Sequence, residues 1–242
     1  MLTRYHVAMH HGWLSAPIEV LPAVDVLGDH VVRLLSGEYD AVVARADDPT
    51  AVAARFAAAG ARRIHLVDLD GARSGHARPD LVRRVVDAVS PAEVQASGGI
   101  RDPADARALL DAGATGIVVG TAAFPNPRRW VDAFGGRLTV ALDVRDRRVR
   151  TAGWTAAGLE LIDAVECCLR GGVPRVLCTA IDRDGTLAGP DLDLVARVAS
   201  SGLRVLAAGG VRSPADVAAL ARAGAEAAVV GRALLGTASP PH

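Results

Sequence analysis

Three aspartates follow short apolar runs at positions that suit proton transfer. Asp25 ends the run in PAVDV, Asp143 ends the run in VALDV, and Asp184 follows another run in AIDRDGT. Charged side chains are costly inside a barrel or sheet unless they are used or paired. Proton transfer beside a carbonyl or an imine needs one protonated and one ionised group, which facing carboxylates with separated pKa values provide. These positions therefore predict general acid–base chemistry.

Other catalytic chemistries lack their residues in this sequence. All 27 basic residues are arginine, so a Schiff-base aldolase, a pyridoxal-phosphate enzyme or a P-loop nucleotidase has no lysine to use. The cysteines Cys167, Cys168 and Cys178 show no CxxC spacing and are expected to be small buried hydrophobes. His65 stands alone in an apolar run, and we expect it to be a satisfied core residue rather than a metal ligand. The sequence predicts neither a catalytic metal nor a cofactor.

A glycine-rich stretch occurs twice. ASGGIRDPADARALLDAGATGIVVGTAAF begins at Ala96 and returns as AAGGVRSPADVAALARAGAEAAVVGRALL at Ala207. Glycine lets the backbone approach an anion closely, and a helix N-terminus adds partial positive charge, so each copy suits a phosphate. The alternative is that duplication merely preserved a packing solution. The predicted phosphate-binding residues are Gly98, Gly99, Gly120, Thr121, Gly209, Gly210, Gly231 and Arg232.

The elements that would position these residues follow a regular order. Apolar β-branched runs alternate with alanine-rich stretches of helical period, and two helices begin with N-caps at Asp102 and Ser213, each followed by proline. Eight such strands predict a (β/α)8 barrel made of two similar half-barrels, with its active site at the C-terminal ends of the strands. The expected strands are Glu19 to Val26, Arg63 to Leu69, Glu93 to Ser97, Gly116 to Gly120, Arg137 to Val144, Arg175 to Ile181, Arg204 to Gly209 and Ala227 to Gly231.

Length and charge limit the domain organisation and the partners. The chain has 242 residues, 50% of them hydrophobic, and a formal net charge of zero. We expect an extension over residues 1–18 and a single barrel domain over 19–242, with the last helix shortened or missing. Zero net charge gives no electrostatic footprint for nucleic acid or membrane, and no secretory signal or membrane span is apparent. A small-molecule substrate, a monomer and a cytoplasmic location are expected.

Taken together, the motifs resemble a known family. PAVDVLGDHVVRL, IHLVDLDGA, SGGIRDPADARALLDAGATGIVVGTAAF, ALDV, GW, DGTLAGPDLDL and AAGGVRSPADVAAL occur in the order and spacing of the phosphoribosyl-formimino-AICAR-phosphate isomerase of histidine biosynthesis. The resemblance extends from about Glu19 to Leu235. It implies a cofactor-free Amadori rearrangement of an aminoaldose to an aminoketose, on a substrate with a phosphate at each end.

The resemblance also implies roles for individual residues. Asp25 would be the base for the sugar C2 proton, and Asp184 the acid that helps to open the ribose ring. Thr179 would hydrogen-bond the sugar, and Asp143 would support the site from the opposite half. Trp154 is suited to stack on an aminoimidazole ring. The substrate would be contacted by Arg33, Asp68, Ser97 and Trp154.

Related families and local departures leave alternatives. The cyclase subunit of imidazole glycerol phosphate synthase shares AIDRDGT, whereas VVRL, GW and LAGPD resemble the isomerase. SGGIRD resembles the dual-substrate actinobacterial form, phosphoribosyl isomerase A, which also acts on phosphoribosylanthranilate in tryptophan synthesis. Ala152 replaces the arginine that this form carries before GW, and Ala180 replaces an acidic residue of the family. A binding protein for a bisphosphorylated ligand is the alternative from another class.

Overall fold

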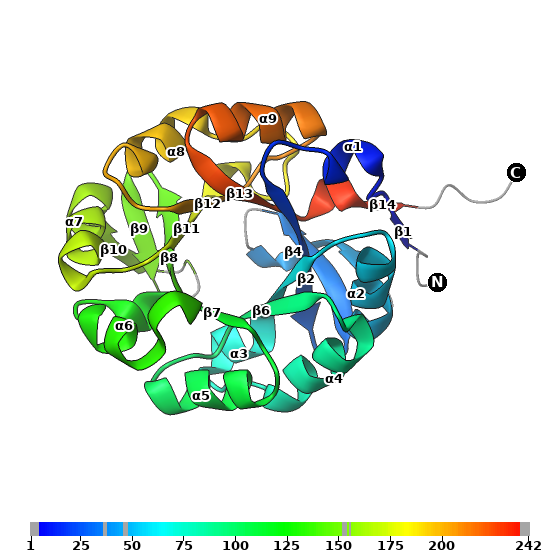
Figure 1. The fold of residues 1–242 in the computed structure, drawn as a ribbon, viewed down its shortest axis with the longest axis horizontal. Coiled ribbons are helices and arrows are strands. Elements are labelled where there is room, and N and C mark those ends of the chain that lie inside the picture. The colour runs from blue at the N-terminus through cyan, green and yellow to red at the C-terminus, as the bar shows by residue number, and fades with distance from the viewer. Residues whose placement is uncertain (1–4, 36–37, 46–47, 152–153, 155, 238–242) are drawn as a thin grey trace, which may run out of the picture.

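The computed structural model describes residues 5–35, 38–45, 48–151, 154 and 156–237. Within them, eight parallel strands form a ring that the pairing of β7 with β8 closes (Figure 1). The predicted (β/α)8 barrel is therefore confirmed, and each expected strand is present with its ends shifted by no more than two residues. In ring order the strands are β2 (Glu19–Leu27), β5 (Arg63–Asp68), β6 (Glu93–Ser97), β7 (Gly116–Val119), β8 (Leu138–Arg145), β11 (Val176–Ala180), β12 (Val205–Ala208) and β13 (Ala225–Val230).

Helices surround the barrel on its outer face (Figure 1). Apolar residues on the helices pack against the outer faces of the strands, while a second cluster that includes Leu21, Leu177 and Leu206 fills the barrel interior. Alternate residues of each strand therefore belong to different cores. The helices that follow the first strand are α2 (Pro49–Ala58), α3 (Leu69–Ser74), α4 (Pro79–Val89), α5 (Pro103–Asp111), α6 (Arg128–Phe134), α7 (Leu161–Gly171), α8 (Leu192–Ala199) and α9 (Pro214–Arg222).

The predicted helix starts in the repeated stretch are confirmed. The Asp102 side chain accepts hydrogen bonds from the backbone N–H groups of Ala104 and Asp105, which completes a capping box at the start of α5. Ser213 caps α9 in the same way through the N–H of Asp216. In both helices proline occupies the first turn, where its missing N–H costs no intrahelical hydrogen bond.

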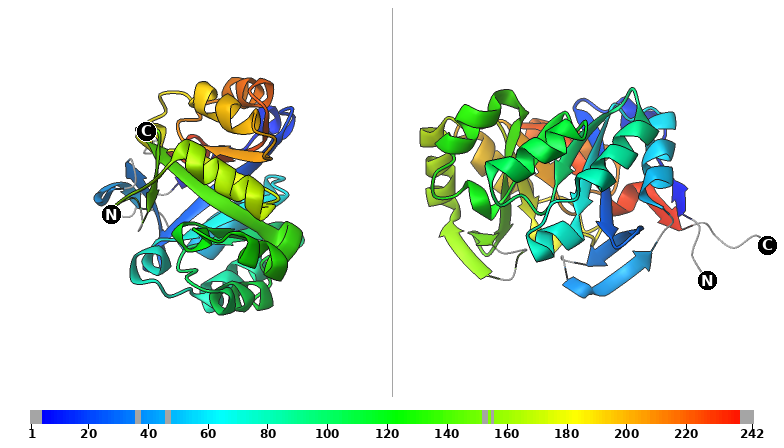
Figure 2. Two further views of the ribbon diagram at one scale, coloured as in Figure 1. Left: turned by 90° about the vertical axis from the view of Figure 1, so that its left-hand side faces the viewer. Right: turned by 90° about the horizontal axis from the view of Figure 1, so that it is seen from below.

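Each half of the barrel carries a β-hairpin after its first strand. β3 (His30–Leu35) and β4 (Glu38–Arg45) follow β2, whereas β9 (Arg148–Thr151) and β10 (Ala156–Glu160) follow β8. Both hairpins project from the same end of the barrel (Figure 2, right), which is the end where the parallel strands terminate. They add walls to the region in which the sequence predicts the active site.

The N-terminal segment closes the ring of helices. β1 (Tyr5–Val7) pairs antiparallel with β14 (Leu235–Thr237), and α1 (His11–Leu14) lies between α9 and α2 (Figure 1). Trp13 is buried there, and Leu14 approaches Gly60 beyond α2. In the described residues, only the short helix η4 (Arg232–Leu234) and β14 follow β13. The last helix of the barrel is thus short in the described residues, as expected, and α1 lies between α9 and α2.

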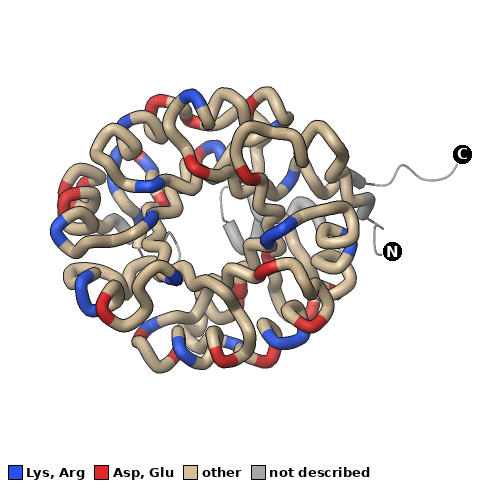
Figure 3. Tube along the Cα trace, in the orientation of Figure 1, with Lys and Arg blue, Asp and Glu red and all other residues tan. Residues whose placement is uncertain are grey.

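Acidic and basic residues are interspersed around the ring (Figure 3), in agreement with the formal net charge of zero. Across the described ranges, no helix is long and apolar enough to span a membrane.

Candidate active site

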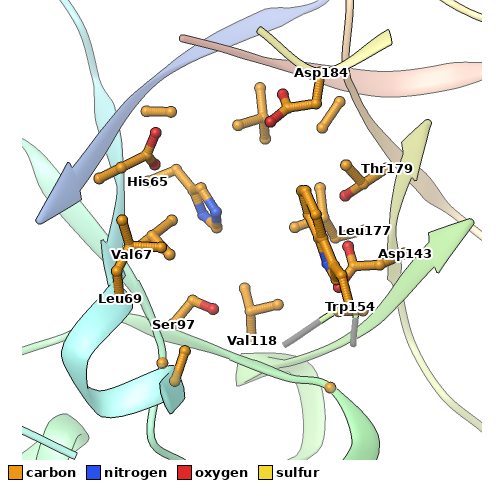
Figure 4. Close-up of a pocket in the computed structure, with 18 of the residues that line it drawn as sticks. His65, Val67, Leu69, Ser97, Val118, Asp143, Trp154, Leu177, Thr179 and Asp184 are labelled. Atoms are coloured by element: carbon orange, nitrogen blue, oxygen red, sulfur yellow. The ribbon is translucent and has the colours of Figure 1, made fainter. Parts of the chain in front are cut away.

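A cavity of about 250 Å³ opens at the C-terminal ends of the strands (Figure 4). Side chains and backbone from both halves of the barrel line it. Among the residues predicted from the sequence, the cavity wall contains Asp25, Ser97, Gly98, Gly99, Gly120, Thr121, Asp143, Trp154, Thr179, Asp184, Gly231 and Arg232. The barrel therefore brings the predicted acid–base residues and most of the predicted anion-binding residues to one place.

The three aspartates reach the cavity from different elements. Asp25 comes from β2 with Ala23 one layer below it, as strand alternation predicts. Asp143 comes from β8, where it is the register partner of Thr179 on β11. Asp184 directly follows the short helix η3 (Ile181–Arg183) in the loop after β11. Carboxylates from both halves thus line one cavity.

Asp143 is held in a buried and hydrogen-bonded position. Burial raises the pKa of its carboxyl group, while hydrogen bonds from the Trp154 and Thr179 side chains oppose that shift. Burial is the larger of the two effects, so the pKa of Asp143 lies above its ordinary value. Its geometry suits a residue that supports Thr179 and Trp154.

Trp154 extends over the cavity from the loop between β9 and β10. Its backbone φ is +73°, which is unfavourable for a residue with a side chain. The Nε atom of Arg150 donates a hydrogen bond of 3.4 Å to the carbonyl oxygen of Trp154, and both residues line the cavity. In Figure 4 the indole lies across the cavity from His65. Ala152 lies outside the described residues.

The two glycine pairs are required by close backbone packing. Gly98 has a φ of +103°, and a Cβ atom there would lie 2.1 Å from the carbonyl oxygen of Asp68. Gly209 has a φ of +98°, and a Cβ atom there would lie 2.5 Å from the carbonyl oxygen of Ala180. Packing alone therefore explains these glycines, and anion binding at them remains a prediction.

The glycine pairs of the two predicted phosphate sites line different spaces. Gly98, Gly99, Gly120 and Thr121 line the main cavity. Gly209 and Gly210 instead line an adjoining recess of about 20 Å³, which shares Asp184, Gly231 and Arg232 with the main cavity. Arg232 donates a 2.6 Å hydrogen bond to the carbonyl oxygen of Gly185, which fixes its guanidinium at this recess.

Two predicted substrate contacts are placed differently from the rest. Asp68 caps α3 through the N–H of Gly71 and accepts hydrogen bonds of 2.9 and 2.6 Å from Arg78, and it is not among the residues that line the cavity. Its Oδ1 atom is thus occupied by structural contacts beside the site, whereas Oδ2 is buried without a hydrogen-bond partner among the described residues. Arg33 belongs to β3, but its side chain lies outside the described part of the structure.

The sequence-based interpretation of His65 as a satisfied core residue is confirmed for its burial, but within the described ranges Nδ1 lacks the hydrogen-bond partner that the interpretation requires. Its side chain is only 4% exposed, but it lines the cavity and points into it (Figure 4), and Nδ1 has no hydrogen-bond partner. Strand alternation carries the signal, because the side chains of His65 and Val67 both face the cavity from β5. Arg101 and Arg150 also line the cavity and were not predicted.

Metal binding finds no support in the described ranges. They contain no group of three or more histidine, cysteine or acidic residues arranged to hold a metal ion. Cys168 and Cys178 are buried, and burial raises the pKa of the Cys168 thiol to about 12, so it is not a thiolate at neutral pH. Carboxylates, hydroxyl groups and an imidazole line the cavity.

A closed (β/α)8 barrel with a cavity lined by carboxylates at the C-terminal ends of its strands defines the chain as an enzyme-type barrel with a small-molecule site. The family model described as "Histidine biosynthesis protein" matches residues 19–239. The chain belongs to this family. The matched range begins at the first residue of β2, so the segment that contains β1 and α1 precedes it.

Curated relatives agree in length and in name. A protein of Roseiflexus sp. (strain RS-1) is 43% identical over 223 residues, which cover 90% of this chain and 94% of the relative. One of Thermomicrobium roseum is 45% identical, with 89% and 91% covered, and one of Acidothermus cellulolyticus is 42% identical, with 90% and 92% covered. All three are named 1-(5-phosphoribosyl)-5-((5-phosphoribosylamino)methylideneamino)imidazole-4-carboxamide isomerase.

Proposed function

We propose that the chain is an aldose–ketose isomerase that converts 1-(5-phosphoribosyl)-5-((5-phosphoribosylamino)methylideneamino)imidazole-4-carboxamide to its phosphoribulosyl form in histidine biosynthesis. The observation that carries the proposal is the placement of Asp25 and Asp184 in the wall of one cavity, from opposite halves of the barrel. The names of the relatives at 43% and 45% identity supply the substrate.

The proposed reaction is an internal rearrangement and needs no outside oxidant. Asp184 gives a proton to the ribose ring oxygen while the bond from that oxygen to C1 breaks, which leaves an iminium group at C1. Asp25 then takes the proton from C2, and the electrons of the C–H bond form an enolamine. Tautomerisation finally moves a proton from the C2 hydroxyl group to solvent while C1 gains a proton. Over the whole reaction the sugar gains protons at the ring oxygen and at C1 and loses protons from C2 and from the C2 hydroxyl group, so the aminoketose product is an isomer of the substrate.

The remaining cavity residues would orient the substrate. Thr179 and Asp143 hydrogen-bond each other, so the Thr179 oxygen remains able to accept a hydrogen bond from a sugar hydroxyl group. Trp154 offers its indole face to the imidazole ring, and Ser97 offers a hydroxyl group from the end of β6. The contacts of Arg33 and Asp68 with substrate stay predictions, and for Asp68 the ion pair with Arg78 favours an indirect role.

A substrate with two terminal phosphates matches the duplicated ends of the cavity. The first end consists of Gly98, Gly99, Gly120 and Thr121, and the second consists of Gly209, Gly210, Gly231 and Arg232. Backbone N–H groups that precede short helices suit phosphate oxygens at both ends. No cofactor enters this scheme. The monomeric state, the cytoplasmic location and the absence of nucleic-acid and membrane partners stay predictions.

The test is to supply the purified protein separately with the histidine-pathway substrate and with phosphoribosylanthranilate, and to follow each product. Turnover of the first substrate is expected. Turnover of the second as well would extend the function to tryptophan biosynthesis and would show that Ala152 is no barrier. Binding of the first substrate without turnover would instead favour a binding protein and contradict the proposal.

A further inference from the structure

A row of polar side chains crosses the barrel interior at the floor of the cavity. His65 on β5, Gln95 on β6 and Thr139 on β8 are 4%, 2% and 1% exposed. His65 and Gln95 are register partners on neighbouring strands. Polar side chains in a dry interior are costly unless they pair with one another, so their arrangement demands an explanation that general packing does not give.

The orientation of the Gln95 amide is set by Thr139. Gln95 Nε2 donates a hydrogen bond of 3.0 Å to Oγ1 of Thr139. This use of the amide nitrogen leaves Oε1 as the acceptor that remains, and Oε1 is buried without a partner in the described residues. Nδ1 of His65, on the adjacent strand, is buried and unpartnered as well. The two orphaned atoms are complementary if Nδ1 carries the proton.

The imidazole of His65 stands beside the predicted base. Ala23 is the register partner of His65, and its small side chain leaves room for the ring one layer below Asp25. Burial lowers the pKa of His65, while the nearby Asp25 carboxylate and the Gln95 side chain oppose that shift. The ring is therefore neutral at neutral pH, and one of its two nitrogens is an acceptor.

We propose that Thr139 and Gln95 are positioning residues that hold His65 in its Nδ1–H tautomer, so that Nε2 faces the cavity beside Asp25 and accepts a hydrogen bond from the sugar substrate. Nδ1–H donates to Oε1 of Gln95 in this arrangement. The substrate's hydroxyl group at C2 is the donor that this acceptor would meet, because Asp25 acts on the same carbon. The substrate contact rests on the proposed function, whereas the tautomer does not.

The first experiment measures the tautomer without substrate, by ¹⁵N NMR of the histidine rings. His65→Asn identifies the His65 signals by their loss. The wild-type protein is expected to show the Nδ1–H tautomer, Thr139→Ser should retain it, and Thr139→Val should convert it to a mixture because the Gln95 amide can then rotate. Thr115→Val is the matched control, since Thr115 makes its hydrogen bond to the carbonyl oxygen of Val94 away from the cavity. An Nε2–H tautomer or an imidazolium ring in the wild type would overturn the proposal.

The second experiment measures turnover with the histidine-pathway substrate. Thr139→Val should lower kcat/KM about tenfold, the size of one lost hydrogen bond of moderate strength, and Thr139→Ser should restore it. In a His65→Asn background, Thr139→Val should have no further effect, because Thr139 acts through His65. Additive losses would show that Thr139 acts independently and would refute the relay. An inactive wild type would contradict the proposed function, while the tautomer measurement would still decide the positioning role.

Discussion

The two halves of the barrel share their scaffold but differ in how they use it. Arg101 N–H donates 2.8 Å to the Asp105 carboxylate before α5, and Arg212 N–H donates 2.8 Å to the Asp216 carboxylate before α9. The side chains diverge, however. The Arg212 guanidinium closes back on Asp216, whereas Arg101 reaches the carbonyl oxygen of Ala72 and lines the cavity. At this matched position before α5 and α9, therefore, only the arginine of the first half lines the cavity.

A second difference concerns the residue under each glycine pair. In the first half, Gly98 packs on Asp68, whose carboxylate is paired with Arg78. In the second half, Gly209 packs on Ala180. When Pro190 is aligned with Pro79, Gly189 stands at the position of Arg78. Both partners of the ion pair are therefore missing together, which avoids a buried unpaired charge.

The two halves share the residues that shape the ends of the cavity and differ in some residues that have proposed chemical roles. The glycine turns and helix caps occur in both halves because both ends of the cavity need the same close packing. Asp184 corresponds in sequence to Ala72 of the first half, and Trp154 belongs to a hairpin whose counterpart follows β2. Asp184 and Trp154, to which the proposed reaction assigns ring opening and stacking, therefore occur in one half only, whereas the proposed base Asp25 has Asp143 at the matching position of β8.

The sharpest way to test this separation is to remove one carboxylate from each half. Asp25→Asn and Asp184→Asn should each lower kcat about a thousandfold and leave KM within about tenfold, because proton transfer is lost while phosphate binding remains. Steady-state kinetics measures both values. Asp132→Asn, in an exposed ion pair with Arg128, is the control and should keep wild-type turnover. Normal turnover in Asp25→Asn would break the assigned mechanism.

The ion pair of the first half should matter for stability. Asp68→Ala should lower the free energy of unfolding by about 3 kcal/mol, because it leaves Arg78 without its main partner and α3 without its cap. The double variant Asp68→Ala with Arg78→Leu should be more stable than the sum of the single losses, as the second half manages without either residue. Urea unfolding of the four proteins measures this cycle, and strict additivity would show that the pair is not coupled.

The glycine pairs should respond unequally to a methyl group. Gly98→Ala should destabilise the protein by about 2 kcal/mol and weaken substrate binding, and Gly209→Ala should do so less, since its added Cβ has 2.5 Å rather than 2.1 Å to the nearest oxygen. Thermal unfolding and KM report the two effects. Gly136→Ala is the matched control, because a Cβ there meets nothing within 4 Å. Equal losses at both sites would argue that the halves tolerate strain alike.

The smallest expected effect is a pH dependence that comes from Asp143. Its pKa in the folded protein lies above the ordinary value of 3.8, so the protonated carboxyl group is favoured by folding at low pH, and that contribution is lost as the pH rises. The free energy of unfolding of the wild type, minus that of Asp143→Asn, should therefore decrease as the pH rises above the ordinary pKa of an aspartate. Denaturant unfolding at a series of pH values measures the difference, and a constant difference would contradict the burial of a titrating group.

Much of the barrel was predictable because its strands and caps are local patterns. Apolar runs such as Arg63 to Leu69 and prolines after Asp102 and Ser213 fix element types within a few residues. The hairpins after β2 and β8 were not predicted, since their strands lie outside the eight-strand pattern of the barrel. Which side chains contact one another inside the barrel was harder to predict. The pairing of Asp68 with Arg78 and the orphaned Nδ1 of His65 depend on neighbours that periodicity does not identify.

The pairing of β1 with β14 joins two segments that are far apart in the sequence. Tyr5 and its partner Thr237 stand on either side of all eight barrel strands. This contact therefore closes a very long loop, with a corresponding entropic cost of closure. Contacts of such high sequence separation form slowly, so we expect the β1–β14 pair to form late in folding, after the barrel strands that lie between its two partners.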